Sequence, residues 1–84
     1  MIVGDVVKLK EPLLGNASGT IGFVYHDYAF GVQVIFENGN YDGFEPEEQN
    51  RFLEKVGHDE KVANYNFKNV ICLGVDFNND FFPF

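Results

Sequence analysis

The residues of this 84-residue chain that could act as nucleophiles or bases are few and lie far apart in the sequence. For nucleophilic catalysis the candidate nucleophiles are Cys72 and Ser18, and the candidate bases are His26 and His58. Cys72 lies in the apolar run 70–73, where a buried thiol reacts poorly. His26 and His58 each precede an aspartate, but neighbouring residues of a strand point to opposite faces, so this adjacency does not indicate a pair. We expect no enzyme activity, because no nucleophile, base and orienting residue can be assembled.

The motifs for metals and nucleotides are incomplete. Residues 76–80, Asp-Phe-Asn-Asn-Asp, match three ligand positions of a calcium loop, but Phe81 stands where that loop requires glycine. Residues 15–20 lack the lysine of a phosphate-binding loop. The cysteine and histidines lack the paired spacing of a zinc site. We therefore expect no metal and no cofactor.

The composition limits the class of protein further. Thirteen acidic and six basic residues give a formal net charge of −7, which repels nucleic acid. Hydrophobic residues make up 45% of the chain and include ten Phe and four Tyr, so we expect a packed core rather than disorder. A single cysteine cannot form an intrachain disulfide, and the first residues do not resemble a signal peptide. We expect a cytoplasmic protein with no membrane contact.

Strands dominate the predicted structure of the first half of the chain. Alternating and β-branched residues predict strands over 6–10, 19–25, 32–37 and 40–44. Gly22 interrupts the second of these strands, and we expect a bulge or a sharp bend there. Residues 26–30 are expected to form a turn or a wide hairpin tip, closed by Gly31.

The pair Asn38-Gly39 gives the strongest local signal, because it predicts a two-residue hairpin turn between alternating segments. Such a turn pairs Phe36 with Tyr41 on the core face. It pairs Ile35 with Asp42 on the opposite face, where Ile35 is either covered by a later segment or exposed as a contact. The residues expected to share the core face are Val32, Val34, Phe36 and Tyr41.

The second half of the chain predicts shorter elements. Pro46, with acidic residues around it, predicts a helical turn near 46–51. A short strand is expected over 52–56, and residues 59–66 are either a helix capped by Asp59 or extended. The remaining expectations are a strand over 70–77, a turn over 78–80 and an aromatic end over 81–84.

Four segments together resemble small SH3-like β-barrels of the KOW type over about residues 1–56. They are Gly4-Asp5-Val6-Val7, Gly19-Thr20-Ile21-Gly22-Phe23-Val24, 32–36 and Phe44-Glu45-Pro46-Glu47. The resemblance implies a mostly-β single domain, an antiparallel SH3-like barrel of five or six strands with a short helical turn near 46–51 and a C-terminal extension over about 58–84. KOW domains that bind RNA have basic loops, whereas the loops here are acidic, so we expect no direct contact with nucleic acid.

Two features indicate how such a domain would bind a partner. The first is an acidic rim that would attract a basic protein or peptide. The second is the aromatic end, which either packs on its own barrel or meets a partner or a second copy of the chain. The candidate partner-binding residues are Ile35, Asp42, Glu45, Glu47, Glu48, Phe81, Phe82 and Phe84.

We therefore expect a non-catalytic protein-interaction module, with homo-oligomers formed through the aromatic end as a further expectation. One alternative is an acidic mimic of nucleic acid that occupies a nucleic-acid-binding protein. The other is a small enzyme or ligand-binding protein, which requires His26 or His58 beside a carboxylate in a pocket.

Overall fold

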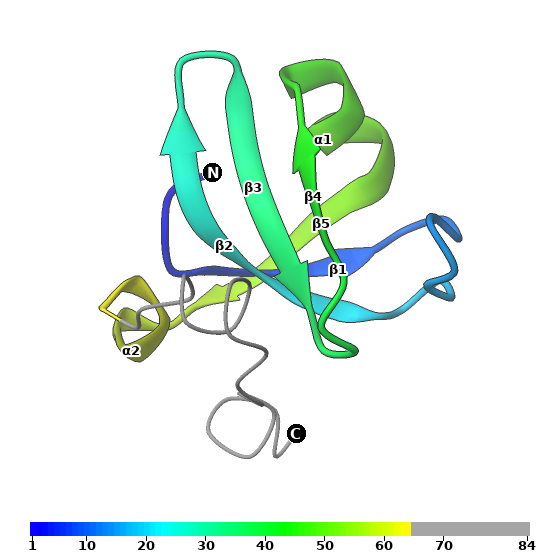
Figure 1. Cartoon of the computed structure of the whole chain (residues 1–84), viewed down its shortest axis with the longest axis horizontal. Coiled ribbons are helices and arrows are strands. Elements are labelled where there is room, and N and C mark those ends of the chain that lie inside the picture. Colours follow the sequence, from blue (N-terminus) through cyan, green and yellow to red (C-terminus); the bar gives the residue numbers. More distant parts are fainter. Residues whose placement is uncertain (65–84) are drawn as a thin grey trace.

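The computed structural model describes residues 1–64, which form one five-stranded antiparallel sheet with two short helical segments (Figure 1). The strands are β1 (Asp5–Leu9), β2 (Ile21–Tyr28), β3 (Gly31–Phe36), β4 (Tyr41–Phe44) and β5 (Leu53–His58). The helices are α1 (Pro46–Phe52) and the single turn α2 (Glu60–Ala63). The mostly-β class and the helical turn before the last described strand are confirmed. The expected strand over 70–77 and the aromatic end over 81–84 lie outside the described residues.

The sheet is strongly curved and encloses a core on one face (Figure 1). Its strand order is β4-β3-β2-β1-β5, and α1 contacts both edge strands, β4 and β5. The fully buried core cluster consists of Val7, Leu9, Val24, Val32, Val34, Phe36, Phe44 and Leu53. Within residues 1–64 no ladder pairs β4 with β5, so closure into an SH3-like barrel stays a prediction.

Gly22 lies where two core side chains pack closely against the backbone of β2. It pairs regularly with Val7 on one side and Phe36 on the other, so the expected bulge at Gly22 is wrong. The irregularity lies further along β2, at Tyr25. A Cβ atom on Gly22 would lie only 2.8 Å from Phe36 Cδ1 and from Val34 Cγ1. Glycine is required here because two core side chains pack against its backbone.

The β2–β3 hairpin is tighter than expected. β2 continues to Tyr28, which pairs with Gly31, so only Ala29 and Phe30 form the turn. The expected turn over 26–30 is therefore wrong. A Cβ atom on Gly31 would lie 2.1 Å from the carbonyl oxygen of Phe44, and the missing side chain lets the hairpin press against the end of β4.

The β3–β4 hairpin has a three-residue loop instead of the expected two-residue turn. The Phe36 N–H donates to the Asn40 carbonyl at 2.7 Å, and the Gly39 N–H donates to the Phe36 carbonyl at 2.8 Å. Gly39 has a φ of +88°, as in a turn that ends on a left-handed residue. Ile35 therefore pairs with Tyr41, one residue away from the expected register.

This shift of one residue exchanges the faces of β4, because successive strand residues point to opposite sides. Tyr41 is exposed rather than part of the core, so that expectation is wrong. Phe44 takes the core position instead and pairs with Val32. Ile35 lies on the opposite face as expected, where it pairs with Phe23, and both side chains are fully buried.

The described part of the second half follows the sequence closely. The Glu48 carboxylate accepts a hydrogen bond from the Glu45 N–H at 3.1 Å at the start of α1. Asp59 caps α2, since its Oδ1 accepts a hydrogen bond from the Lys61 N–H at 2.9 Å. The helical alternative for residues 59–66 is thus confirmed over Glu60–Ala63. Among residues 1–64 no helix has the length and apolar character needed to cross a membrane.

We expect the substitution Gly22→Ala to lower the free energy of unfolding by about 1–3 kcal/mol, because the new methyl group would displace core side chains. Urea unfolding followed by circular dichroism measures this change. Gly57→Ala is the matched control, since Gly57 also lies in a strand but a Cβ there would meet no atom within 4 Å. The control should change stability by at most about 0.5 kcal/mol. Equal unfolding midpoints for the two variants would contradict the proposed packing at Gly22.

Candidate functional site

The end of the β2–β3 hairpin carries three aromatic rings, of which those of His26 and Phe30 are exposed and that of Tyr28 is half-buried. Phe30, in the two-residue turn, is 73% exposed. His26 and Tyr28 are two residues apart on β2, so they share one face of the strand. Their rings stack with centroids 6.1 Å apart and planes at 9° to each other. The end of the hairpin therefore presents two rings from a paired strand and a third, Phe30, from the turn that the strands hold in place.

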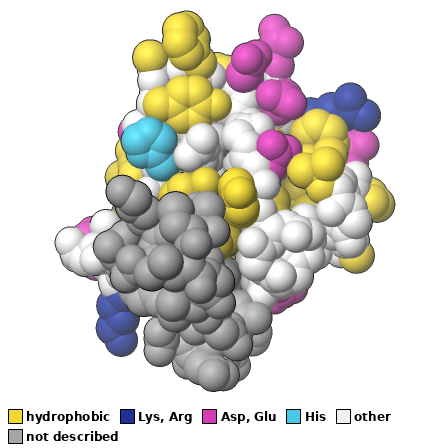
Figure 2. Space-filling view, viewed as in Figure 1, with side chains coloured by type: hydrophobic (Ala, Val, Ile, Leu, Met, Phe, Trp, Pro, Cys, Tyr) yellow, Lys and Arg dark blue, Asp and Glu magenta, His cyan; other side chains and the backbone are white. Residues whose placement is uncertain are grey.

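The fold brings the acidic start of α1 next to these rings. A Cβ atom on Gly31 would lie 3.1 Å from the Glu45 Cα, and one on Gly43 would lie 3.1 Å from the Tyr28 hydroxyl. The side chain of Tyr28 therefore extends across the sheet toward β4. Glu45 comes two residues after Gly43, and its backbone is extended. Figure 2 shows acidic side chains on the same face as hydrophobic side chains and a histidine, over the β2–β3 hairpin and the start of α1.

We call this surface the aromatic-acidic face and define it by His26, Tyr28, Phe30, Glu45 and Glu47. Both acidic residues are exposed. Glutamate in the first turn of a helix also interacts favourably with the positive end of the helix dipole. The carboxylates of this face are therefore accessible to a partner.

The structure brings together some of the expected partner-binding residues and not others. Three of them lie together at the start of α1, namely Glu45, Glu47 and Glu48. The Glu48 carboxylate accepts a hydrogen bond from the Glu45 N–H. Asp42 is half-buried on β4, and its Oδ1 accepts a hydrogen bond from the Gly43 N–H at 2.8 Å. Ile35 is buried and contributes nothing to an exposed surface. The remaining candidates, Phe81, Phe82 and Phe84, lie outside the described residues.

The sequence-based prediction missed the contribution of His26, Tyr28 and Phe30, because this segment was expected to be a turn. A signal was present in the spacing, since aromatic rings at every second position are typical of one face of a strand. The glycine that follows at position 31 indicated a turn but not its length.

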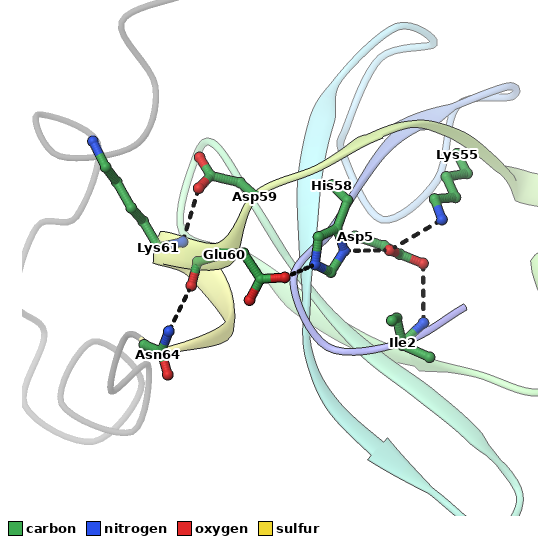
Figure 3. Close-up of polar contacts among 8 residues, drawn as sticks. All are labelled: Ile2, Asp5, Lys55, His58, Asp59, Glu60, Lys61 and Asn64. Carbon is green, nitrogen blue, oxygen red and sulfur yellow. Dashed lines mark hydrogen bonds and ion pairs between the residues drawn. The ribbon is translucent and has the colours of Figure 1, made fainter.

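A second group of polar residues surrounds a buried carboxylate at the start of β1. This carboxylate lies beside the end of β5, where the sheet meets α2 (Figure 3). Asp5 is fully buried and accepts hydrogen bonds from the Ile2 N–H at 3.0 Å and from His58 Nδ1 at 2.8 Å. Lys55 Nζ lies 3.3 Å from the same carboxylate. Burial by itself would raise the pKa of Asp5, but these donors outweigh burial and hold the pKa below its usual value of 3.8. Asp5 is therefore ionised at neutral pH.

His58 bridges two carboxylates. Its Nδ1 bonds Asp5, and its Nε2 lies 3.0 Å from Glu60 Oε1 on α2. The hydrogen bonds to Asp5 and then to Glu60 raise the pKa of His58 above its usual value of 6.5. An imidazolium that donates from both nitrogens has no free nitrogen to act as a base, and here it links Asp5 on β1 to Glu60 on α2.

The surroundings of His58 agree with one expectation and leave another open. His58 does not pair with its neighbour Asp59, which caps α2 instead. However, His58 does line a pocket of about 500 Å³ together with Val6, Ile21 and Val56. A histidine beside a carboxylate in a pocket is the feature that the ligand-binding alternative requires.

Within residues 1–64, no three His, Cys, Asp or Glu side chains form a cluster suited to hold a metal ion. Comparisons with protein-family models, curated proteins and solved structures found no match to this chain.

We expect the stability of the protein to fall as the pH rises through the folded-state pKa of His58. Because that pKa is raised, the stabilisation from the His58 imidazolium is fully present below pH 6.5 and is lost as the folded protein gives up the proton. Urea unfolding across this pH range should show the decline in the unmodified protein and much less of it in His58→Gln. His26→Gln is the matched control and should keep the decline. An identical pH dependence in His58→Gln and the unmodified protein would contradict this role for His58.

Proposed function

We propose that this chain is a non-catalytic protein-interaction module that binds a basic segment of another protein on its aromatic-acidic face. The observation that carries the proposal is Phe30, a large apolar side chain that is 73% exposed at the tip of a tight hairpin. Exposed aromatic residues beside charged ones are typical of protein-binding surfaces.

The hairpin supports binding because it is already held in one conformation. Tyr28 pairs with Gly31 across the turn, and the backbone of Gly31 packs against Phe44. His26 and Tyr28 are stacked before any partner arrives. A preorganised surface loses little conformational entropy on binding, so more of the contact energy remains as affinity.

The chemistry of the face favours a basic partner. A lysine or arginine side chain can lie over the ring of Tyr28 or Phe30 in a cation–π contact. Glu45 and Glu47 would meet the same charged group, and the net charge of −7 would speed its approach. The rings add an apolar contribution that ionic attraction alone does not provide.

The two alternatives lead to different expectations. An acidic mimic of nucleic acid would depend chiefly on charge, and its complex would weaken sharply with added salt. A ligand-binding protein would use the pocket lined by Val6, Ile21, Val56 and His58, at the α2 end of β5. Our proposal places the contact on the β2–β3 hairpin and predicts a moderate dependence on salt.

We expect short peptides rich in Lys and Arg, with one or two apolar residues, to bind the protein and to shift the backbone amide resonances of the β2–β3 hairpin and the start of α1. Phe30→Ser should weaken this binding about tenfold or more, because it removes the central apolar contact. Nuclear magnetic resonance titration with the peptides measures both effects. The same peptides with Glu in place of Lys and Arg should not bind.

Val56→Ser is the matched control, since Val56 is also an exposed apolar residue but lies on β5. It should leave peptide binding within about twofold of the unmodified protein. Equal binding by Phe30→Ser and the unmodified protein would refute the proposed face. Resonance shifts confined to Val6, Val56 and His58 would favour the ligand-binding alternative instead.

A further inference from the structure

The loop between β1 and β2 contains a third, smaller hairpin, which projects from the side of the sheet (Figure 1). Leu13 and Asn16 pair as an isolated antiparallel bridge, with reciprocal N–H to carbonyl distances of 3.0 and 2.8 Å. Leu14 and Gly15 form its turn and have φ values of +52° and +79°. Two consecutive positive φ values are the pattern of the tight primed turns that close two-residue hairpins.

Leu14 is an unexpected residue for this position. It is the only non-glycine residue with a positive φ within residues 1–64, and its side chain is 59% exposed. Side chains other than those of Gly, Asn and Asp rarely adopt this conformation. Because its side chain is exposed, Leu14 contributes little packing that could offset the backbone strain. Packing within the fold therefore does not account for a leucine at this position.

Asn16 carries a buried hydrogen-bond donor that nothing in the described structure satisfies. Its side chain is 3% exposed, and its Nδ2 has no partner among residues 1–64. Buried polar groups without partners are rare and require an explanation.

The orientation of the Asn16 amide follows from its neighbours. The Asn40 N–H donates to Asn38 Oδ1 at 3.0 Å, which fixes the amide of Asn38. Asn38 Nδ2 must then donate to Asn16, so the atom of Asn16 that it meets is the oxygen, Oδ1. Asn16 Nδ2 is thereby left as the unpaired group, and rotating the amide by half a turn would place two donors against each other.

A surface pocket of about 510 Å³ lies at this turn, and Asn16 is one of its lining residues. It is lined by Pro12, Leu13, Leu14, Gly15, Asn16 and Ala17. No charged side chain is among these residues, so a carboxylate in the pocket would lose its hydration without meeting a positive charge. The lining instead suits an aliphatic group that is accompanied by one neutral hydrogen-bond acceptor.

We propose that the 12–17 hairpin is a docking site for a segment of another protein, which places an aliphatic side chain against Leu14 and Pro12 and a backbone carbonyl oxygen on Asn16 Nδ2. The Asn16 amide donates the hydrogen bond, and the carbonyl accepts it. Because Nδ2 is out of contact with solvent, the turn must shift slightly to admit the carbonyl. Binding at this site is independent of the aromatic-acidic face.

The test uses N-acetyl-leucine methylamide as the probe, because it carries one aliphatic side chain and neutral carbonyl groups. Titration into the full chain, followed by nuclear magnetic resonance, should shift the side-chain NH₂ resonances of Asn16 and the methyl resonances of Leu14. N-acetyl-leucine, which has a free carboxylate, should bind at least several-fold more weakly. Isopentanol, which has the aliphatic group without a carbonyl, should leave the Asn16 NH₂ resonances unchanged.

Leu14→Gly separates binding from folding. Glycine adopts a φ of +52° without strain, so this variant should unfold at the same urea concentration as the unmodified protein or at a higher one, yet lose binding of the probe. Asn16→Asp keeps an oxygen for Asn38 and replaces the donor by an acceptor, so it should also lose binding. If Asn16→Asp fails to fold, Leu14→Gly and the Asn16 resonances still decide the outcome.

Three results would overturn the proposal. They are unchanged Asn16 NH₂ resonances at saturating probe, tighter binding of the free acid than of the methylamide, and full probe binding by Leu14→Gly. Loss of binding at this hairpin would leave peptide binding at Phe30 intact, so the two proposals fail separately.

Discussion

The described structure depends on keeping one buried carboxylate ionised. Asp5 lies at the start of β1 with no exposure to solvent, and it accepts hydrogen bonds from the backbone of Ile2 and from His58. Lys55 adds a third partner, which carries a positive charge. An ionised group in this position would be strongly destabilising if its partners were removed. The partners come from the first residues and from β5, so the carboxylate ties both to β1, and through His58 it reaches Glu60 on α2.

The protein keeps its structural charges and its proposed binding charges at opposite ends of β5. At the α2 end, Asp5 and Glu60 are neutralised by His58 and Lys55. At the α1 end, Glu45 and Glu47 have no such cationic neighbours among the described ion pairs. Unneutralised carboxylates beside exposed rings are available to a partner, whereas neutralised ones stabilise the fold. This division supports a binding surface on the β2–β3 hairpin and a structural role for His58.

The sequence predicted the types and order of the elements better than it predicted their ends. Alternation and Pro46 were sufficient for the strands and for α1, because both depend on local preferences. The register at Tyr41 was missed because Asn-Gly fits both two-residue and three-residue loops, and only the packing of Phe44 in the core decides between them. The pairing of Asp5 with His58 spans 53 residues, and no local pattern could reveal it. For the aromatic-acidic face, the sequence analysis identified the acidic residues as candidates but did not identify the aromatic rings of the β2–β3 hairpin.

The ionisation of Asp5 is the most direct test of this account, and carbon-13 resonances of its side-chain carboxyl report it. Because the folded-state pKa is lowered, the stabilisation from this group is present above pH 3.8 and is lost as the pH falls through the folded-state pKa. The account predicts that the Asp5 carboxyl titrates below pH 3.8, together with acid unfolding of the sheet. An Asp5 carboxyl that takes up its proton at or above pH 3.8 while the sheet remains folded would contradict the account.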